Sequence, residues 1–289
     1  MNLLEPLTAE AQLAELVVPA RLPLRSDGTR LMRLSVSSLR LFWKCPERWR
    51  RRYLLREREP QSGPMLVGGA VGATVTAYYA ARLAGESLSA DEAGDLLVAE
   101  FDERLAGPRT DLGDDEPQTL RDQAREALGA YLAEVAREVR PLAVERKIEL
   151  RFESTDWTFV GYVDVEDERG RVIDIKVGAK HVGQAAADRD PQASGYLLAR
   201  TLEGKPASRF EFHSIRRGAV RSGGRCLVVP TERNRERLAL FEARIAQTAR
   251  EIARCEQTGD WPLSTPDGWW CAPGQCQAWS SCPGGRPRS

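Results

Sequence analysis

The segment GYVDVEDERGRVIDIKV at residues 161–177 constrains the fold more than any other part of the chain. It contains two short runs rich in Val and Ile, separated by Asp167–Gly170, and this pattern predicts a β-hairpin. Side chains alternate along a strand, so Asp174 and Lys176 leave the second strand on the same face. Ile175 lies between them and is expected to point toward the core. The segment therefore predicts a sheet that carries charged side chains on one face.

The rest of the chain predicts helices on both sides of this hairpin. Helical spacing and helix-end residues indicate helices before it at about residues 35–58, 69–83, 90–105 and 117–139. Pro60, Gly63 and Pro64 are expected to separate the first two. After the hairpin we expect a helix at 191–200, strands near 209–215 and 226–229, and a long helix capped by Thr231 and ending near residue 255. This order predicts a mixed α/β fold, with a small central mixed sheet flanked by helices, after an irregular lead-in at residues 1–30.

Asp164 in the first strand is expected opposite Asp174 if the hairpin pairs through its turn. Two carboxylates on one side of a sheet repel each other unless a cation lies between them. Mg²⁺ or Mn²⁺ suits such a site and could activate water against a phosphoryl group, while Lys176 positions the nucleophile or stabilises the developing charge. Glu145 begins the preceding strand and could add a third carboxylate. The alternative is a surface hairpin with an ordinary Asp–Lys pair.

Two polar residues of the next expected helix could line the same site. Gln192 and Tyr196 stand four residues apart, so they share one face of that helix. The two histidines do not extend the site. His213 lies in an expected strand and is interpreted as a packed or edge residue, whereas His181 lies in an expected loop.

A net charge of zero hides two blocks of opposite sign. Residues 30–58 contain ten Lys or Arg against two Glu, whereas residues 86–116 contain eleven acidic residues against two Arg. In the basic block arginines alternate with aromatic residues, which suits single-stranded nucleic acid because bases stack on rings and phosphates pair with cations. We therefore expect DNA contacts from Arg48, Arg50, Arg51, Arg52, Trp49 and Tyr53. The alternative is a solvated surface helix.

The cysteines are grouped in a way that indicates metal binding. The N-terminal residues MNLLEPLTAE are acidic and no apolar run approaches the length of a membrane span, so we expect a cytoplasmic protein without membrane contact. Clustered thiols in that compartment bind metal more often than they form disulfides. Cys45 precedes a proline in an aromatic-rich segment and is the candidate fourth ligand beside Cys271, Cys276 and Cys282. Four thiolates suit zinc or an iron–sulfur cluster. Cys226 and Cys255 are expected to be small buried side chains.

In order along the chain, GYVD, VIDIK and QASGY resemble the motifs of PD-(D/E)XK nucleases, specifically the RecB-like branch that includes CRISPR-associated and phage-encoded exonucleases. SVSSLRLFWKCPERWRRRYL is similar to the opening helix of that branch, and GGAVGATVTAYY to its second motif. The resemblance runs from about Leu34 to Cys282. It implies a restriction-endonuclease-like nuclease domain at residues 34–258 with a helical insertion at about 85–140, preceded by a lead-in at 1–33. Residues 259–289 would form a Cys-rich tail, packed on the helix of Cys45 and closed by a metal cluster.

The resemblance also implies roles for single residues. Asp164 and Asp174 would bind Mg²⁺ or Mn²⁺ together with the backbone carbonyl of Ile175. Lys176 would be the catalytic lysine, and the site would be shaped by Gln192 and Tyr196, which would also contact DNA. A four-iron four-sulfur cluster would be held by Cys45, Cys271, Cys276 and Cys282. The family's second motif usually carries a metal-binding histidine where Gly72 stands here, so water, Glu145 or the substrate phosphate would complete the metal site, or activity is weakened or lost.

Three functions follow as hypotheses. The first is a metal-dependent DNA exonuclease that prefers single-stranded ends and acts in recombination or repair, phage DNA processing or CRISPR adaptation. The second, suggested by Gly72, is a weakened or inactive subunit that binds DNA or supports assembly. The third is a zinc-stabilised interaction module. The sequence has no helicase-type phosphate loop, so unwinding would require a helicase or a recombination or CRISPR adaptation partner.

Overall fold

The computed structural model describes residues 32–57, 59–151, 157–207, 209–220, 224–265 and 268–285. The chain divides into two compact units, each built from several segments. The first unit comprises Met1–Glu59, Glu149–Val160 and Ala239–Ser289, and the second comprises Pro60–Ile148 and Gly161–Leu238. The expected lead-in lies outside the described residues up to residue 31.

The second unit contains a mixed sheet built around the expected hairpin. Strand β3 (Trp157–Asp167) enters this unit at Gly161 and pairs antiparallel with β4 (Arg171–Gly178). Strand β4 pairs in parallel with β5 (Arg209–Arg216), and β5 pairs antiparallel with β6 (Cys226–Thr231). Strand β2 (Pro141–Arg151) also pairs with β3. The expected mixed sheet with flanking helices is therefore confirmed.

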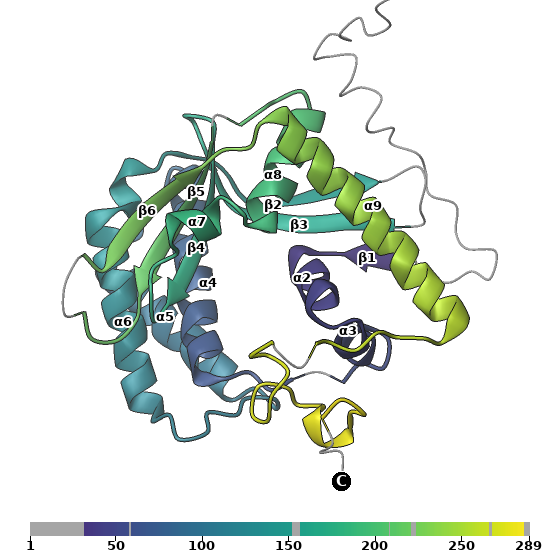
Figure 1. Ribbon diagram of the computed structural model, residues 1–289. Helices are drawn as coiled ribbons and strands as arrows, with labels where there is room; N and C mark the ends of the chain where they lie inside the picture. The colour runs from purple at the N-terminus through teal and green to yellow at the C-terminus, as the bar shows by residue number, and fades with distance from the viewer. Residues whose placement is uncertain are drawn as a thin grey trace, which may run out of the picture. The chain divides into compact units, whose positions relative to one another are not determined.

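Three helices pack together against this sheet. They are α4 (Gly63–Leu83), α5 (Ala90–Leu105) and α6 (Pro117–Glu134), and Figure 1 shows them close to β4, β5 and β6. Apolar residues from all three helices form one buried core with Val165, Ile173 and Ile215 of the strands. Two further helices, α7 (Gln184–Ala187) and α8 (Pro191–Leu202), contact β6 and β5 respectively. No described helix is both long and apolar enough to cross a membrane.

Several helix ends differ from those expected. Helix α4 begins at Gly63, six residues earlier than predicted, and so includes Pro64 in its first turn. Proline is tolerated there because an N–H in the first turn has no partner within the helix. Helix α6 ends at Glu134, and a short 3-10 helix, η1 (Ala136–Glu138), follows it. By contrast, α5 has the expected bounds, which are fixed at the start by a capping box between Ser89 and Glu92.

In the first unit, the expected helix at 35–58 is two helices. Helix α2 (Val36–Lys44) and helix α3 (Pro46–Tyr53) are separated by Cys45, whose backbone is extended (φ −161°, ψ 103°). The prediction of one helix was wrong because the residue before a proline disfavours helical geometry. The Cys45 Sγ accepts a hydrogen bond from the Arg48 backbone N–H at 3.4 Å and so caps α3. This unit also contains β1 (Met32–Leu34), parallel to the start of β3, and the 3-10 helix η2 (Trp279–Ser281).

The long C-terminal helix, α9 (Arg235–Thr258), begins later than expected. Thr231 belongs to β6 and does not cap it. Instead, the Asn234 side chain accepts a hydrogen bond from the Arg237 backbone N–H at 3.0 Å. Asn is at least as favourable at the N-cap as Thr. Asn234 caps α9 because it stands directly before Arg235, the first helical residue.

Candidate active site

The hairpin brings two aspartates together. Strands β3 and β4 pair through Val165↔Ile173 and Glu166↔Val172, a register that places Asp164 opposite Asp174 when it is continued by one residue. The Asp164 Oδ2 accepts a hydrogen bond from the Ile175 backbone N–H at 2.7 Å. The Asp164 side chain of β3 thus satisfies a backbone N–H of β4.

Asp174 is buried and engaged on both carboxylate oxygens. Only 1% of the residue is exposed. Its Oδ2 forms an ion pair with Lys176 Nζ at 2.7 Å, and its Oδ1 accepts a short hydrogen bond from the Gln192 side-chain amide. The Lys176 ammonium also donates to Gln192 Oε1 at 3.0 Å. These three side chains therefore form a closed polar triangle beside Asp164.

Helix α8 supplies the remaining side chains that were expected at this site. The Asp190 side chain accepts a hydrogen bond from the Gln192 backbone N–H at 2.8 Å and caps the helix directly before Pro191. The Gln192 amide lies 3.3 Å from the Tyr196 hydroxyl, one helical turn further along. The cap and the four-residue spacing together orient both side chains toward Asp174.

Glu145 approaches the aspartates from β2 under backbone strain. Its φ is +50°, a left-handed conformation that is rare for a residue other than Gly, Asn or Asp. The Glu145 Oε1 accepts a hydrogen bond from Thr76 Oγ1 of α4 at 3.2 Å. Its charge contributes to raising the pKa of Asp164. Strain of this kind persists only where surrounding structure imposes it, and it is concentrated at functional sites.

The aspartates are electrostatically suited to a cation. Burial, followed by the charge of Asp174, raises the pKa of Asp164 to about 8. The pKa of Tyr196 is also raised, first by burial and then by the charge of Asp174. Asp164 and Asp174 are neighbouring carboxylates that repel each other, and together they provide the oxygen ligands that hard divalent ions prefer. Within the described part of the chain, however, no three His, Cys, Asp or Glu side chains are grouped closely enough to hold one ion, so two aspartates and backbone or water oxygens are the available ligands.

Two glycines of the second unit have different surroundings. A Cβ on Gly72 of α4 would meet no heavy atom within 4 Å, so the position expected to carry a histidine has room for a side chain. A Cβ on Gly161 would lie 2.5 Å from Tyr196 Cε1 and 3.2 Å from Ile148 Cγ1. Gly161 is therefore required for the close approach of the Tyr196 ring, a role that the sequence analysis missed although the glycine lies within its main motif.

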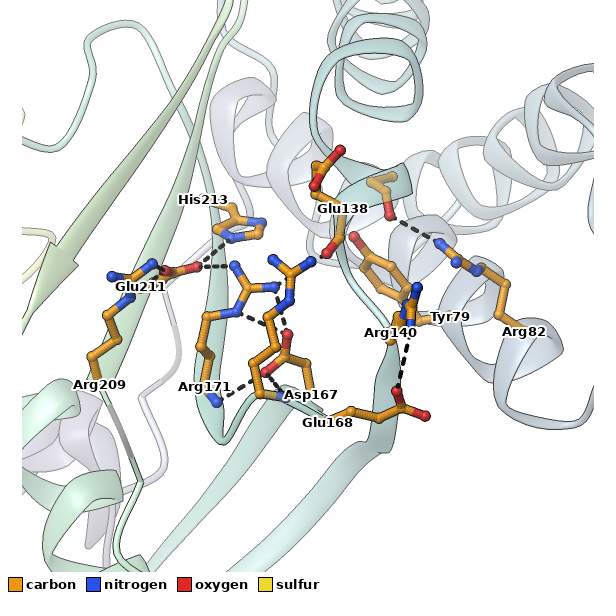
Figure 2. Close-up of polar contacts among 12 residues, drawn as sticks. Tyr79, Arg82, Glu138, Arg140, Asp167, Glu168, Arg171, Arg209, Glu211 and His213 are labelled. Atoms are coloured by element: carbon orange, nitrogen blue, oxygen red, sulfur yellow. Dashed lines mark hydrogen bonds and ion pairs between the residues drawn. The ribbon is translucent and has the colours of Figure 1, made fainter.

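A buried polar network that was not anticipated lies in the same unit, and Figure 2 shows most of its members. Arg171 of β4 forms ion pairs with Asp167 at 2.5 Å and with Glu211 at 2.9 Å. Glu211 Oε2 lies 3.3 Å from His213 Nε2.

His213 is 2% exposed, so it is a packed residue, and its Nδ1 lies 2.8 Å from the Tyr131 hydroxyl. The network continues from Tyr131 to the Tyr79 hydroxyl at 2.8 Å. Since His213 pairs with Ile175 in the β4–β5 register, these bonds fix the strand beside the aspartates.

The arginines of α3, expected to face DNA, are largely paired with glutamates of the same unit. Arg48 binds Glu59 at 2.5 Å, and both Arg50 and Arg51 bind Glu47, at 2.7 and 2.9 Å. Weaker pairs join Arg51 to Glu57 and Arg52 to Glu59. Arg51 also donates to Ser281 Oγ at 3.0 Å. The side chains of Arg48, Arg51 and Arg52 line a cavity of about 250 Å³, together with Glu57, Glu59, Gln277, Ala278 and Ser281.

The two aromatic residues of α3 differ in exposure. Trp49 is 1% exposed and stacks on Trp261 with ring centroids 5.8 Å apart. Its indole N–H donates to Ser38 Oγ at 2.8 Å. Both faces of a ring so buried are occupied by protein, which removes Trp49 from the residues that could stack on a base. Tyr53 is 36% exposed and lies under the Arg52 guanidinium.

The four grouped cysteines all lie in the first unit. Each is partly exposed and carries a free thiol. Burial raises the pKa of Cys271, and the charges of Cys45, Cys276 and Cys282 raise it further, so each of these three thiols lies within electrostatic range of Cys271. Among the described residues, however, no three cysteines are grouped closely enough to hold a metal ion. Cys255 is fully buried, as expected, and Cys226 is half-buried in β6, where burial and Glu134 raise its pKa to about 12.

Comparisons with known proteins identify one solved structure with a similar fold and one matching family. A putative exonuclease from Eubacterium rectale, known from a crystal structure, is 12% identical over 88% of this chain and 92% of its own, with a TM-score of 0.55. A second crystal structure, of SSO0001, covers 98% of both chains at 13% identity and a TM-score of 0.43. No curated protein matches the sequence. The model of the PD-(D/E)XK nuclease superfamily matches residues 33–283. The chain therefore belongs to the PD-(D/E)XK nuclease superfamily.

Proposed function

We propose that this protein is a divalent-metal-dependent DNA exonuclease that acts on single-stranded ends. Membership of the superfamily supports a nuclease that hydrolyses phosphodiester bonds. Metal-dependent hydrolysis is supported by one arrangement. Asp164 and Asp174 lie side by side, and Lys176 and Gln192 are bonded to Asp174. The name of the Eubacterium rectale neighbour supports the exonuclease assignment.

A divalent cation fits the donor set of this site. Asp164, Asp174 and the backbone carbonyl of Ile175 would hold it, and Glu145 would contribute through water. When bound, Mg²⁺ or Mn²⁺ polarises a phosphoryl oxygen and lowers the pKa of water. It would also offset the repulsion that now raises the pKa of Asp164.

The protein's own groups would position the substrate and stabilise charge. The Lys176 ammonium, 36% exposed at its side chain, can turn from Asp174 toward a phosphoryl oxygen on which negative charge develops. Gln192 holds Lys176 and Asp174 in place, because its amide oxygen accepts from Lys176 and its amide nitrogen donates to Asp174. Tyr196 supports Gln192 from the following turn. Gln192 and Tyr196 would therefore shape the site and contact DNA at its edge.

A matched pair of lysine variants tests this proposal. Purified protein with Mg²⁺ or Mn²⁺ should release nucleotides from end-labelled single-stranded DNA faster than from blunt duplex, and should leave circular single strands intact. Lys176→Ala should abolish release, whereas Lys205→Ala, in the exposed turn after α8, should not. Cleavage of circular DNA would contradict the exonuclease assignment, and equal activity of both lysine variants would contradict the role of the site.

A binding subunit with weakened activity is the second candidate, and Gly72 favours it. The open space at this position means that the described structure places no side chain there to act as a further ligand. Such a protein would bind DNA equally well with Asp174→Ala and would release no nucleotides with either metal. The same assay therefore separates the two candidates. For either one, strand separation would come from a helicase or from a recombination or CRISPR adaptation partner.

We further propose a four-iron four-sulfur cluster at Cys45, Cys271, Cys276 and Cys282. Support comes from the electrostatic influence of Cys45, Cys276 and Cys282 on Cys271 and from the position of Cys45 at the break between α2 and α3. A cluster there would join these helices to the tail and contribute directly to folding free energy. Arg51, bonded to Ser281 beside Cys282, already links the same segments.

Metal analysis of anaerobically purified protein tests the cluster. We expect iron and sulfide in equal amounts and broad visible absorption, all lost in Cys45→Ser and Cys276→Ser. The control, Cys226→Ser, should retain them because that thiol lies in β6. Zinc without iron would contradict the cluster and favour a zinc-stabilised module.

A further inference from the structure

Tyr162 is a large aromatic residue that the packing of the second unit does not explain. It lies in β3 with 51% of its surface exposed. Its neighbours in the strand, Gly161 and Val163, are buried. An aromatic side chain usually stabilises a fold by being buried, and about half of the surface of Tyr162 is not buried.

The backbone that carries Tyr162 is nevertheless held firmly. Its backbone hydrogen-bonds with the Tyr196 hydroxyl. The Tyr196 ring packs directly against Gly161, where no Cβ could be accommodated. The exposed ring is therefore presented from a fixed strand, so a ligand that binds it would lose little conformational entropy on this side.

The ring also lies close to the aspartates. Tyr162 precedes Asp164 by two residues in one strand, which separates their Cα atoms by about 7 Å. This distance is comparable to the size of one nucleotide. A base attached to a phosphate at Asp164 and Asp174 would thus fall within reach of the Tyr162 ring.

We propose that Tyr162 is a stacking platform for a nucleobase next to the scissile phosphate, a role that rests on the proposed nuclease function. Every base has a π-face, so such a platform accepts single strands with little regard to sequence. A base in a duplex is already stacked and paired, so it must be extruded before it can bind. Tyr162 thereby supplies a physical basis for preferring single-stranded ends.

Three variants separate stacking from other roles of this residue. Tyr162→Ala should weaken binding of a fluorescein-labelled single-stranded oligonucleotide in metal-free buffer by about 5- to 150-fold, the range measured for one stacked base. With Mg²⁺ it should raise KM by a similar factor and change kcat little. Tyr162→Phe should behave like the wild type. Leu96→Ala, which removes an exposed apolar side chain from α5, is the matched control and should have no effect.

Two further measurements identify the interaction itself. The dependence of binding on salt should keep its slope in Tyr162→Ala, because a ring neutralises no phosphate. An oligonucleotide with one abasic position, moved stepwise along the strand, should bind the wild type less tightly at one position only. At that position Tyr162→Ala should cause no further loss.

Each outcome bears on one proposal. If the wild type cleaves DNA and Tyr162→Ala, folded by circular dichroism, binds and cleaves like it, the stacking role is refuted while the nuclease stands. If no metal supports cleavage but Tyr162→Ala weakens binding with the abasic signature, stacking stands and the proposed hydrolysis fails. A loss that is equal at every abasic position would also refute stacking.

Discussion

The Asp164 carboxylate accepts a hydrogen bond from the Ile175 backbone N–H over 2.7 Å, which joins the two strands of the hairpin at the candidate site. Asp164 thus has two roles, one in holding β4 and one in presenting charge next to Asp174. The first role needs only an acceptor oxygen, whereas the second needs ionisation. Substitutions that remove one role and not the other can therefore separate structure from catalysis.

We predict that Asp164→Asn abolishes cleavage without destabilising the metal-free protein. The amide keeps an oxygen for the Ile175 N–H and removes the repulsion from Asp174 that raises the pKa of Asp164. Asp164→Ala should also be inactive, but it leaves this backbone donor without its partner, at a cost of about 1 to 3 kcal/mol. Thermal melting in EDTA, beside a nuclease assay, checks both. An Asn variant that melts well below the wild type would contradict this account.

We predict that Gly72→His folds and binds Mn²⁺ more tightly than the wild type, by about 10-fold. The position has free space around the new Cβ, and the resemblance to the RecB-like nucleases leads us to expect a metal-binding histidine there. Gly72→Ala is the matched control, since it stabilises α4 by about 0.5 to 1 kcal/mol without adding a ligand. Isothermal titration with Mn²⁺ compares the three proteins. Equal affinities of the His and Ala variants would mean that the side chain at 72 does not reach the ion.

The contrast between what was predicted and what was missed has a physical basis. The hairpin, its register and the face shared by Gln192 and Tyr196 follow from strand and helix periodicity, which are local properties. The pairing of Arg48 with Glu59 and the burial of Trp49 depend on contacts beyond α3 that its local pattern does not encode. The pairs of Glu47 with Arg50 and Arg51, by contrast, have the three- and four-residue spacing of one helix face and were overlooked in the sequence. A run of basic and aromatic residues therefore looked like a nucleic-acid surface although much of it stabilises the fold.

We predict that stability falls between about pH 4.3 and pH 7 because of Glu242 in α9. The residue is 8% exposed, and burial raises its pKa to about 7. A carboxyl that binds its proton more tightly when folded than when unfolded stabilises the fold below its unfolded pKa, near 4.3, and loses this contribution as pH rises through 7. Glu242→Gln should thus be more stable than the wild type by about 1 to 2 kcal/mol at pH 8 and about equal at pH 4, where the carboxyl is protonated in both states. Urea unfolding at both pH values measures this, with Glu251→Gln, on the exposed side of the same helix, as control. A pH-independent difference would assign the effect to packing and not to ionisation.

We predict that Gly161→Ala destabilises the second unit chiefly through Tyr196, which a new Cβ would approach more closely than it would Ile148. The new methyl group would lie 2.5 Å from the Tyr196 ring, and relieving that overlap costs about 1 to 3 kcal/mol. In a Tyr196→Ala background the same substitution should cost much less, because the clashing atoms are gone, and the difference between the two costs is the coupling energy of the pair. Urea unfolding of the four proteins measures it. Gly129→Ala in α6, where a Cβ meets nothing within 4 Å, should instead stabilise the protein by about 0.5 to 1 kcal/mol. If Gly161→Ala costs the same in both backgrounds, the glycine serves the backbone of β3 and not the approach of Tyr196. In that case the Gly161→Ala protein should cleave DNA at the rate of the wild type after correction for the unfolded fraction.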